Sequence, residues 1–340
     1  RTVRNPEERF EEDALRLMRA IRLVAELNFA LDSETAAAIQ KKASNLGHVS
    51  RERVRDELTR ILESSQPMMA LVLAQQLGLL DYIVPDLLRG IGVDQNQAHS
   101  YTVFEHNLRS MQHAADKGWP FDIRLAALFH DIAKPETRRW SKEKRDWTFH
   151  GHEVVGGRVA EKALTDLRFS RETIDKVVKL VRWHMFFSDP EQITLSAVRR
   201  TIRNVGKENI VDLLNLRICD RIGTGRPKEQ PFRFRKYKAM VDEALRDPVS
   251  VGMLKTDGSR IMEKFHVKPG PLIGHILNAL LEEVIEDPGR NTEQYLDIRT
   301  KELLELPEAD LHRLGDAGKK AKEVKEEEEI QEILRKHRVE

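Results

Sequence analysis

The chain has 340 residues, of which 33% are charged and 6% aromatic, and its 57 Lys and Arg nearly balance its 56 Asp and Glu. This length allows a sizeable buried core and two or three domains. The sequence has no apolar run long enough for a membrane-spanning helix, and its single cysteine, Cys219, excludes a disulfide framework. Because no signal-peptide pattern opens the chain, we expect a cytoplasmic protein without a membrane partner.

Apolar residues recur at helical spacing along most of the chain, so the sequence predicts an all-α fold. The expected helices are Pro6–Leu31, a segment from Ser33, Arg51–Leu62 with Ser50 as N-cap, Pro67–Leu80 and Pro271–Glu286. We expect a less regular link over Pro248–Gly270, and a solvated helix or disordered tail from Asp316. Alternating runs of Val, Ile and Thr are missing, so no sheet is expected.

The first expected helix contains Glu12, Asp13 and Arg16 in the pattern Glu-Asp-x-x-Arg. Asp13 and Arg16 are three residues apart, so we expect them side by side on one helix face. A carboxylate beside a guanidinium can accept a hydrogen bond from a base amino group and donate to ring acceptors. That arrangement suits reading of the Watson–Crick edge of cytosine or adenine. The alternative is an ordinary ion pair between Glu12 and Arg16.

Six ligand-type side chains lie in otherwise apolar or amphipathic segments of the middle of the chain. They are His106, His130, Asp131, His152, His184 and Asp220. Burying such groups without a partner is costly, and a divalent metal would satisfy them. Imidazole and carboxylate ligands suit several ions, so Mg, Mn, Ni and Fe all remain candidates. The alternative for any one histidine is a core residue with an ordinary hydrogen bond.

The pair His130–Asp131 lies in an apolar segment, Arg124–Pro135, which we expect to be a helix that ends at the proline. Asp131 is a predicted catalytic residue because its carboxylate can bridge a metal and water. Lys134 is the second, because its ammonium group can face developing negative charge, a role that a spare histidine could also fill. This chemistry suits hydrolysis of a phosphomonoester or a 2′,3′-cyclic phosphate.

Positive charge is concentrated between residues 199 and 238, where twelve Lys and Arg outnumber four Asp and Glu. Phe232, Phe234 and Tyr237 lie among the last of these cations. Basic side chains neutralise phosphates and aromatic rings stack on bases, so the segment predicts an RNA-binding surface. The predicted RNA-binding residues are Arg199, Arg200, Arg203, Arg226, Arg233, Arg235 and Lys236. The alternative is a solvated loop after the segment that carries Asp220.

The order His, His-Asp, His, His, Asp resembles the metal-binding pattern of the HD phosphohydrolase superfamily. The resemblance implies four core metal ligands and two further ligands or phosphate contacts. The core ligands are His106, His130, Asp131 and Asp220, and the further residues are His152 and His184. The superfamily often has Gly before the Lys that follows the doublet, whereas Ala133 stands here.

Three segments resemble class II tRNA nucleotidyltransferases and bacterial poly(A) polymerases: the Glu-Asp-x-x-Arg segment, Ser50–Leu58, and Lys268–Gly274 with the sequence Lys-Pro-Gly-Pro-Leu-Ile-Gly. The resemblance implies that Glu12, Asp13 and Arg16 form a template for CTP and ATP, and that tRNA is the partner. It also implies an elongated multi-helix neck over 1–90 with the template helix. A helical HD domain over 91–245, a tRNA-contacting helical region over 246–315 and a charged tail over 316–340 follow.

The catalytic head of this family has a Gly-Ser pair followed by Asp-x-Asp, but Gly258-Ser259 has no such sequence behind it, and the chain opens at Arg1. We therefore expect a separate or missing head, and no nucleotidyl transfer by this chain alone. The expected function is the neck, RNA-binding and HD portion of a tRNA nucleotidyltransferase with metal-dependent phosphohydrolase activity. The alternatives are a non-catalytic RNA-binding body with a structural HD site, and a stand-alone HD nucleotide phosphohydrolase.

Overall fold

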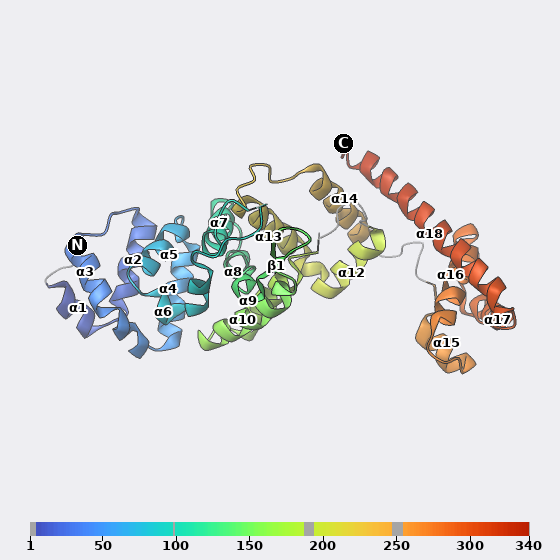
Figure 1. Cartoon of the computed structure of the whole chain (residues 1–340), viewed down its shortest axis with the longest axis horizontal. Coiled ribbons are helices and arrows are strands. Elements are labelled where there is room, and N and C mark those ends of the chain that lie inside the picture. Colours follow the sequence, from blue (N-terminus) through green and yellow to red (C-terminus); the bar gives the residue numbers. More distant parts are fainter. Residues whose placement is uncertain (1–4, 98, 187–193, 247–253, 340) are drawn as a thin grey trace. The chain divides into compact units, whose positions relative to one another are not determined.

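The computed structural model describes residues 5–97, 99–186, 194–246 and 254–339. Helices dominate this part of the chain, and two short strands form the one sheet in it (Figure 1). The all-α prediction is therefore confirmed, although the sheet was not expected. The chain divides into two compact units, one of residues 1–188 and 203–231 and the other of residues 189–202 and 232–340. Across the described ranges, every helix is too short or too polar to cross a bilayer.

The first unit opens with a group of closely spaced helices. They are α1 (Pro6–Glu12), α2 (Arg16–Leu27), α3 (Ser33–Lys42), α4 (Arg51–Glu63), α5 (Pro67–Gln76) and α6 (Leu80–Ile83), with the 3₁₀ segments η1 (Ala43–His48) and η2 (Pro85–Gly90). Buried Leu17 and Ile21 of α2 belong to a core against which α4 and α5 pack. The predicted helix starts at Ser33 and Arg51 are confirmed, and Ser50 is the N-cap residue of α4.

Two predicted helices of this group are interrupted. The predicted helix Pro6–Leu31 is wrong because the backbone is extended at Asp13, with φ −152° and ψ 102°. The Asp13 carboxylate accepts a hydrogen bond from the backbone N–H of Leu15 at 3.2 Å, which satisfies a donor near the start of α2. The predicted helix Pro67–Leu80 ends at Gln76, because Gly78 has a φ of +73°, a conformation that glycine adopts without steric cost.

The second part of this unit carries the predicted ligands. Its elements are α7 (Val103–Asp116), α8 (Phe121–Phe129), α9 (Lys134–Thr137), β1 (Arg139–Ser141), β2 (Asp146–Thr148), α10 (His152–Asp166), α11 (Arg171–Trp183), η3 (Lys207–Asn209) and α13 (Ile210–Gly223). α7 packs against α8 and α13, and α10 packs against α11. The helix predicted to end at Pro135 is wrong, because α8 ends at Phe129 and Pro135 lies in the first turn of α9.

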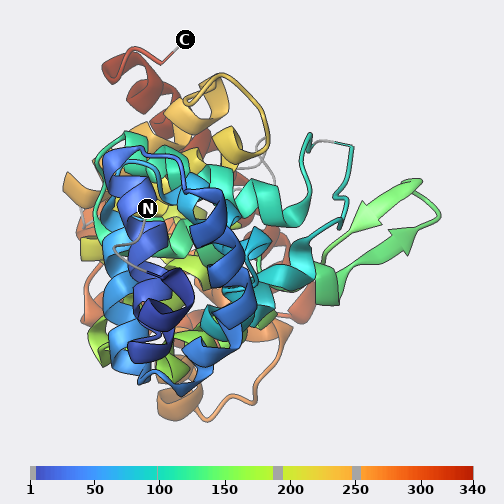
Figure 2. The same cartoon turned by 90° about the vertical axis from the view of Figure 1, so that its left-hand side faces the viewer.

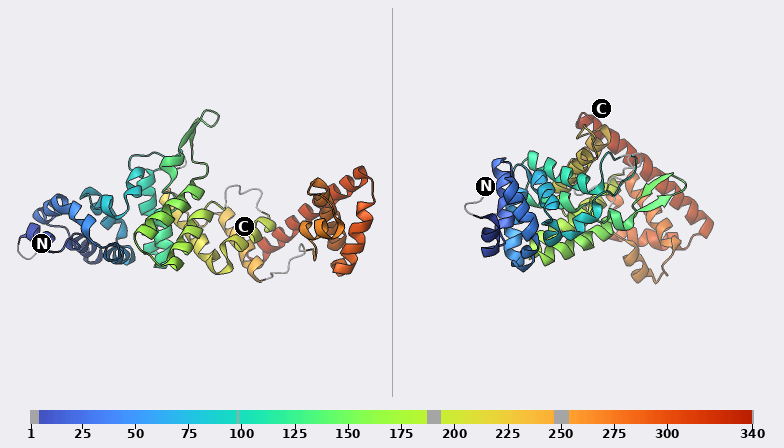
Figure 3. Two further views of the ribbon diagram at one scale, coloured as in Figure 1. Left: turned by 90° about the horizontal axis from the view of Figure 1, so that it is seen from below. Right: turned by 60° about the vertical axis from the view of Figure 1, so that its left-hand side comes forward.

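The antiparallel hairpin of β1 and β2 contradicts the expectation that no sheet is present. Trp140 pairs with Trp147, and Arg139 with Thr148. Figure 2 shows the two strands extending away from the helices that precede and follow them in the chain. The left-hand view of Figure 3 shows the same two strands protruding from the helices. Each strand has three residues, so the alternating pattern that marks a longer strand is absent from the sequence.

The second unit is a separate helical core. Its elements are α12 (Leu195–Val205), whose last residues belong to the first unit, α14 (Phe232–Arg246), α15 (Gly258–Phe265), α16 (Pro271–Glu286), η4 (Pro288–Arg290), α17 (Glu293–Leu304) and α18 (Glu308–Lys336). The predicted helix Pro271–Glu286 is confirmed. The predicted link over Pro248–Gly270 lies partly outside the described residues, and its remainder contains α15, whose N-cap is Asp257.

The charged tail is helical rather than disordered. α18 runs from Glu308 to Lys336, so the boundary expected at residue 316 falls inside a helix. Its Leu311 belongs to a buried cluster with Ile276 and Leu280 of α16. Near its other end, Ile330 and Ile333 are buried and α18 packs against α14. The apolar residues that fix the helix are therefore spaced among charges rather than grouped.

Candidate metal centre

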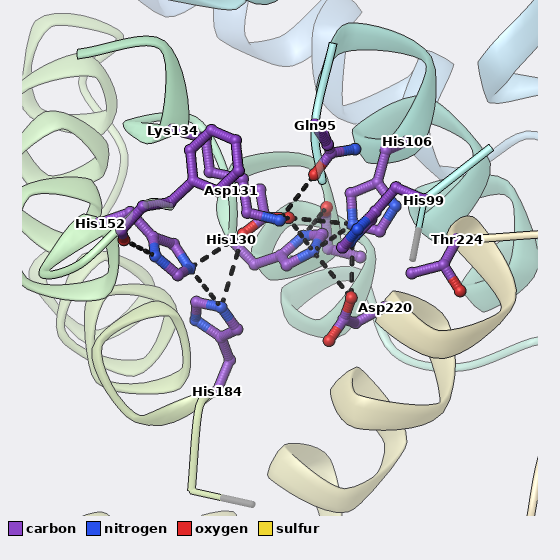
Figure 4. A network of polar contacts seen from close by, with 12 residues as sticks. Gln95, His99, His106, His130, Asp131, Lys134, His152, His184, Asp220 and Thr224 are labelled. Carbon is purple, nitrogen blue, oxygen red and sulfur yellow. Dashed lines mark hydrogen bonds and ion pairs between the residues drawn. The ribbon is translucent and has the colours of Figure 1, made fainter. Parts of the chain in front are cut away.

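The six predicted ligands converge at one buried place in the first unit (Figure 4). His106 lies in α7, His130 and Asp131 follow α8, and Asp220 lies in α13. His152 is the first residue of α10, and His184 directly follows α11. All six are buried, and Asp131 is only 1% exposed. Because α8 ends just before the doublet, His130 and Asp131 lie in a turn. Their side chains meet the ligands carried by α7, α10 and α13 and the one that follows α11.

One group of ligands surrounds the Oδ2 atom of Asp131. The Nε2 atom of His106 lies 3.0 Å from this oxygen, and that of His130 lies 3.3 Å from it. The Oδ1 atom of Asp220 lies 3.4 Å from Nε2 of His106 and 3.7 Å from Nε2 of His130. Two carboxylates and two imidazoles thus face one point, a donor set that suits a divalent cation.

A second group surrounds the other oxygen of the same carboxylate. The Oδ1 atom of Asp131 lies 3.2 Å from Nε2 of His152 and 3.6 Å from Nε2 of His184. The two imidazole nitrogens are 3.2 Å apart. Asp131 therefore belongs to both groups. The donor atoms of His106, Asp131 and Asp220 lie close enough together to hold one ion, and so do those of Asp131, His152 and His184. This carboxylate thus lies between two sets of histidines, and each of its oxygens could reach a separate cation.

Backbone carbonyl groups orient three of the histidines. The Nδ1 atoms of His130, His152 and His184 lie 2.8, 2.6 and 2.7 Å from the carbonyl oxygens of Ala127, Phe149 and Val181. A carbonyl oxygen only accepts, so each Nδ1 carries a proton and donates it. In the neutral imidazole this places a lone pair on Nε2, the atom that faces Asp131 in every case. The pattern is that of histidines held for metal ligation.

The charges at the centre perturb its histidines in opposite directions. Burial disfavours the imidazolium of His130, but the negative charges of Asp131 and Asp220 outweigh it and raise the pKa of His130 to about 10. Burial dominates at His184, whose pKa falls to about 4. Burial also raises the pKa of Asp131, but Lys134 and His130 hold that pKa well below its usual range. The centre is thus built around two ionised carboxylates that a cation would neutralise.

The buried carboxylate oxygens that lack hydrogen-bond donors are a second indication that these residues suit a metal. Neither carboxylate oxygen of Asp131 accepts a hydrogen bond of normal geometry, although the Nζ atom of Lys134 lies 2.6 Å from Oδ2. Lys134 offsets part of this charge, but a buried carboxylate with unsatisfied lone pairs is costly, and a divalent cation would satisfy the remaining ones. Lys134 also donates to Oε1 of Gln95 at 2.7 Å and is 6% exposed. The structure thus places both predicted catalytic residues, Asp131 and Lys134, in contact.

His99 joins this centre and was not identified from the sequence. It belongs to the first ligand group with His106, Asp131 and Asp220. Its Nδ1 atom lies 2.6 Å from the Oδ1 atom of Asn96, and burial lowers the pKa of its imidazole to about 3. A neutral ring with Nδ1 protonated has its Nε2 lone pair available as a ligand. His99 lies in the loop before α7, where neither helical spacing nor the HD pattern marks it.

Close helix packing sets the distance between His106 and Asp220. Gly223 ends α13 at a point where an added Cβ atom would lie 2.1 Å from Oγ of Ser110 and 3.1 Å from Nδ1 of His106. Only glycine fits at this contact between α7 and α13. Cys219, one turn earlier in α13, is buried, and burial raises its pKa well above the usual range.

The predicted template residues lie at the break between α1 and α2. The expectation that Asp13 and Arg16 lie side by side on one helix face is wrong, because Asp13 precedes α2 and Arg16 begins it. Arg16 pairs with Glu12 at 2.7 Å, which is the alternative ion pair considered for this segment. Asp13 pairs instead with Arg53 of α4 at 3.1 Å. Base reading by these residues remains a prediction, and both side chains have protein partners here.

The predicted RNA-binding residues fall in both units. Arg203 and Arg226 belong to the first unit, and the other five, Arg199, Arg200, Arg233, Arg235 and Lys236, belong to the second. Two of the aromatic residues proposed to stack on bases are unsuitable, because Phe234 and Tyr237 are buried in the core of the second unit. Phe232 is 43% exposed. The helical spacing of the buried rings in α14 explains the error, since it is the spacing of core residues.

Comparisons with known proteins agree with this architecture. A model described as the probable RNA and SrmB-binding site of polymerase A matches residues 28–90, and the HD domain model matches residues 103–223. A CC-adding tRNA nucleotidyltransferase of Thermus thermophilus is 34% identical over 290 residues, which are 82% of this chain and 64% of that protein. An A-adding tRNA nucleotidyltransferase of Deinococcus radiodurans is 32% identical over 288 residues, or 81% of this chain and 65% of that protein.

The chain belongs to the tRNA nucleotidyltransferase family. It spans 64% and 65% of the length of these two relatives. A crystal structure of the Bacillus stearothermophilus CCA-adding enzyme in complex with CTP aligns with a TM-score of 0.48 and 22% identity, covering 88% of this chain and 65% of that one. In this family member the HD match contains all six predicted ligands. Asp13 and Arg16 lie before the polymerase A match.

Proposed function

We propose that this chain is the RNA-binding and metal-dependent phosphohydrolase portion of a tRNA nucleotidyltransferase that acts at tRNA 3′ ends. The observation that carries the proposal is the carboxylate of Asp131, whose two oxygens face two different groups of histidines. Such an arrangement suits displacement at phosphorus, where attacking and leaving oxygens both need charge stabilisation. The proposed substrates are phosphomonoesters and 2′,3′-cyclic phosphates.

The proposed ligands are the six residues predicted from the sequence together with His99. A divalent cation there would lower the pKa of a water molecule and offset charge on phosphoryl oxygens. Asp131 would hold the two ligand groups at a fixed separation. The Nζ atom of Lys134, buried beside it, would donate to a phosphoryl oxygen in place of Gln95. In hydrolysis of a cyclic phosphate, water adds to phosphorus, one ribose P–O bond breaks, and the released ribose oxygen takes a proton.

The choice of the tRNA 3′ end is supported by the relatives, which are named as CC-adding and A-adding tRNA nucleotidyltransferases. Nucleotide addition needs a free 3′ hydroxyl, which a terminal cyclic phosphate blocks. A phosphohydrolase joined to such an enzyme would prepare the end for addition. The match to an RNA-binding model over residues 28–90 supports a role of the neck helices in holding RNA.

Nucleotidyl transfer is proposed only in combination with a head domain, whose Gly-Ser and Asp-x-Asp pattern this sequence lacks. In that complete enzyme, Asp13 and Arg16 would select CTP and ATP. For both to face a base, the ion pairs of Arg16 with Glu12 and of Asp13 with Arg53 would have to open. The domain ranges expected from the sequence, 1–90, 91–245, 246–315 and 316–340, are kept as part of this proposal.

The direct test is hydrolysis of 2′,3′-cyclic AMP by the purified chain after chelation and stepwise return of Mg, Mn, Ni or Fe. Asp131→Asn is the test variant. Glu136→Gln is the matched control, because Glu136 is exposed on α9 near Lys134. Metal-dependent turnover that is lost in Asp131→Asn and kept in Glu136→Gln supports the proposal. No turnover with any metal, or full turnover in Asp131→Asn, overturns it and favours the non-catalytic RNA-binding body.

A further inference from the structure

The hairpin of β1 and β2 carries positive charge and aromatic rings that the proposed hydrolysis does not use. Residues 138–148 include five cationic side chains and only two carboxylates. The cations are Arg138, Arg139, Lys142, Lys144 and Arg145. Within the described part of the chain, Lys142, Lys144 and Arg145 form no ion pair. All three are exposed. Their charge is therefore directed at solvent or at a partner.

Trp140 of β1 is an exposed aromatic residue of the hairpin. It packs against its cross-strand partner Trp147, with ring centroids 5.2 Å apart and planes at 77°. Such a pair stabilises a two-stranded hairpin, which is marginal by itself. Yet 54% of Trp140 stays in contact with solvent. More than half of a large aromatic side chain is thus exposed beside several cations.

Arg138 fixes the other ring. Its guanidinium carbon lies 3.7 Å from the centroid of the Trp147 ring, a close cation–π contact. The surface therefore combines a ring held by a cation, an exposed ring and a row of lysines and arginines. Single-stranded nucleic acid is bound by this combination, because bases stack on aromatic rings while cations follow the phosphates. In a duplex the bases are already stacked on one another, so the exposed ring has no equivalent partner.

The hairpin is connected to the metal centre at both ends. β1 follows α9, which contains Lys134, and β2 leads through Phe149 to His152. The carbonyl oxygen of Phe149 accepts the Nδ1 hydrogen bond of His152, and Nζ of Lys134 lies 5.4 Å from the centroid of the Phe149 ring. Asp146 of β2 accepts a hydrogen bond from the backbone N–H of Gln97 at 3.1 Å, in the loop that also contains Gln95. The same short segments thus position the ligands and the hairpin.

We propose that the hairpin is the docking surface for the single-stranded 3′ end of an RNA whose terminal phosphate enters the metal centre. A base near the end stacks on Trp140, and Lys142, Lys144 and Arg145 contact the backbone phosphates. The choice of RNA and of a terminal phosphate rests on the proposed function. The location of the surface rests on the hairpin alone.

The binding test uses the full chain and a 5′-labelled single-stranded 12-nucleotide RNA with a 3′-terminal phosphate, with a blunt duplex of the same sequence for comparison. Trp140→Val is the test variant, because valine keeps the strand and an apolar contact with Trp147 but offers no ring. We expect it to weaken single-strand binding roughly 5- to 100-fold. Trp140→Tyr should restore most of the affinity. Ile298→Ala, at an exposed apolar residue of α17, is the control and should bind as the wild type.

A second binding measurement tests the cations. The slope of log affinity against log salt is negative, and each phosphate contact of a single strand adds about 0.7 to its magnitude. Changing Lys142 and Lys144 to Gln should therefore make the slope shallower by about 1.4. An unchanged slope contradicts the phosphate contacts. Equal single-strand binding by wild type and Trp140→Val overturns the proposal, as does equal wild-type binding of single strand and duplex.

Hydrolysis separates this proposal from the proposed function. 2′,3′-Cyclic AMP lacks the neighbouring nucleotides that the hairpin would contact, so Trp140→Val should hydrolyse it as the wild type does. The same variant should show a raised KM for an oligonucleotide that ends in a 2′,3′-cyclic phosphate. If neither protein hydrolyses cyclic AMP, the proposed hydrolysis fails, and the binding measurements with the 12-nucleotide RNA still decide the role of the hairpin.

Discussion

The Oδ1 atom of Asp131 lies 3.2 Å from the Nε2 atom of His152. The opposite oxygen of this carboxylate faces His106 and His130. One side chain is therefore shared between two ligand groups, and its removal should affect both. Removal of a histidine that belongs to one group should affect only the ion held by that group. This difference separates a two-metal centre from a single site with spare histidines.

The contact between α7 and α13 predicts the effect of Gly223→Ala. The new Cβ atom would lie 2.1 Å from Oγ of Ser110 and 2.9 Å from the carbonyl oxygen of His106, so α7 must shift. We expect a loss of roughly 1–3 kcal/mol in the free energy of unfolding, measured by urea denaturation, together with weaker metal binding. Gly157→Ala in α10 is the control, because its Cβ would meet only ordinary contacts at 3.8 Å or more. A fully stable Gly223→Ala variant with normal metal binding contradicts this packing.

Lys134→Met should separate binding from chemistry. The methionine keeps most of the buried volume but loses the ammonium group that lies 2.6 Å from Asp131. If Lys134 stabilises charge on the phosphoryl group, kcat for cyclic phosphate hydrolysis should fall roughly 100- to 1,000-fold while the metal content is unchanged. If the variant instead loses metal and activity in proportion, the role of Lys134 is to position Asp131 for metal binding.

Tyr237 gives the second unit a pH-dependent stability that is independent of the metal centre. Burial raises the pKa of Tyr237 to about 12, whereas an unfolded tyrosine titrates at about 10. The stability that the neutral phenol contributes is complete below the unfolded pKa and is lost as pH rises through about 10 to 12. The free energy of unfolding should therefore fall more steeply over this range in the wild type than in Tyr237→Phe. Parallel curves would show that the phenol is not buried in solution.

The sequence predicts the helices well where apolar spacing and end signals coincide, as in Pro271–Glu286. It does not predict the break at Asp13, because the apolar spacing continues through it and an extended residue leaves no compositional mark. The hairpin was missed because its strands have three residues each. Length and alternation are the signals on which a strand prediction depends.

Some residues of the candidate site could likewise be predicted from the sequence and others could not. Residue type and order identified six side chains that the structure brings together. His99 was missed because a loop histidine has no periodic context, and its approach to His106 depends on tertiary packing. Phe234 and Tyr237 were assigned to a surface because their neighbours in sequence are basic. Their burial depends on the helical turn of α14, which orients them inward.

The most direct measurement is metal stoichiometry by elemental analysis of the chelated chain after reconstitution with Mn. The wild type should bind two equivalents, His184→Ala one, and Asp131→Asn fewer than one, since Asp131 serves both ligand groups. His48→Ala, at an exposed histidine outside the centre, should bind as the wild type. One equivalent or none in the wild type, or two in Asp131→Asn, would contradict a two-metal centre built on Asp131.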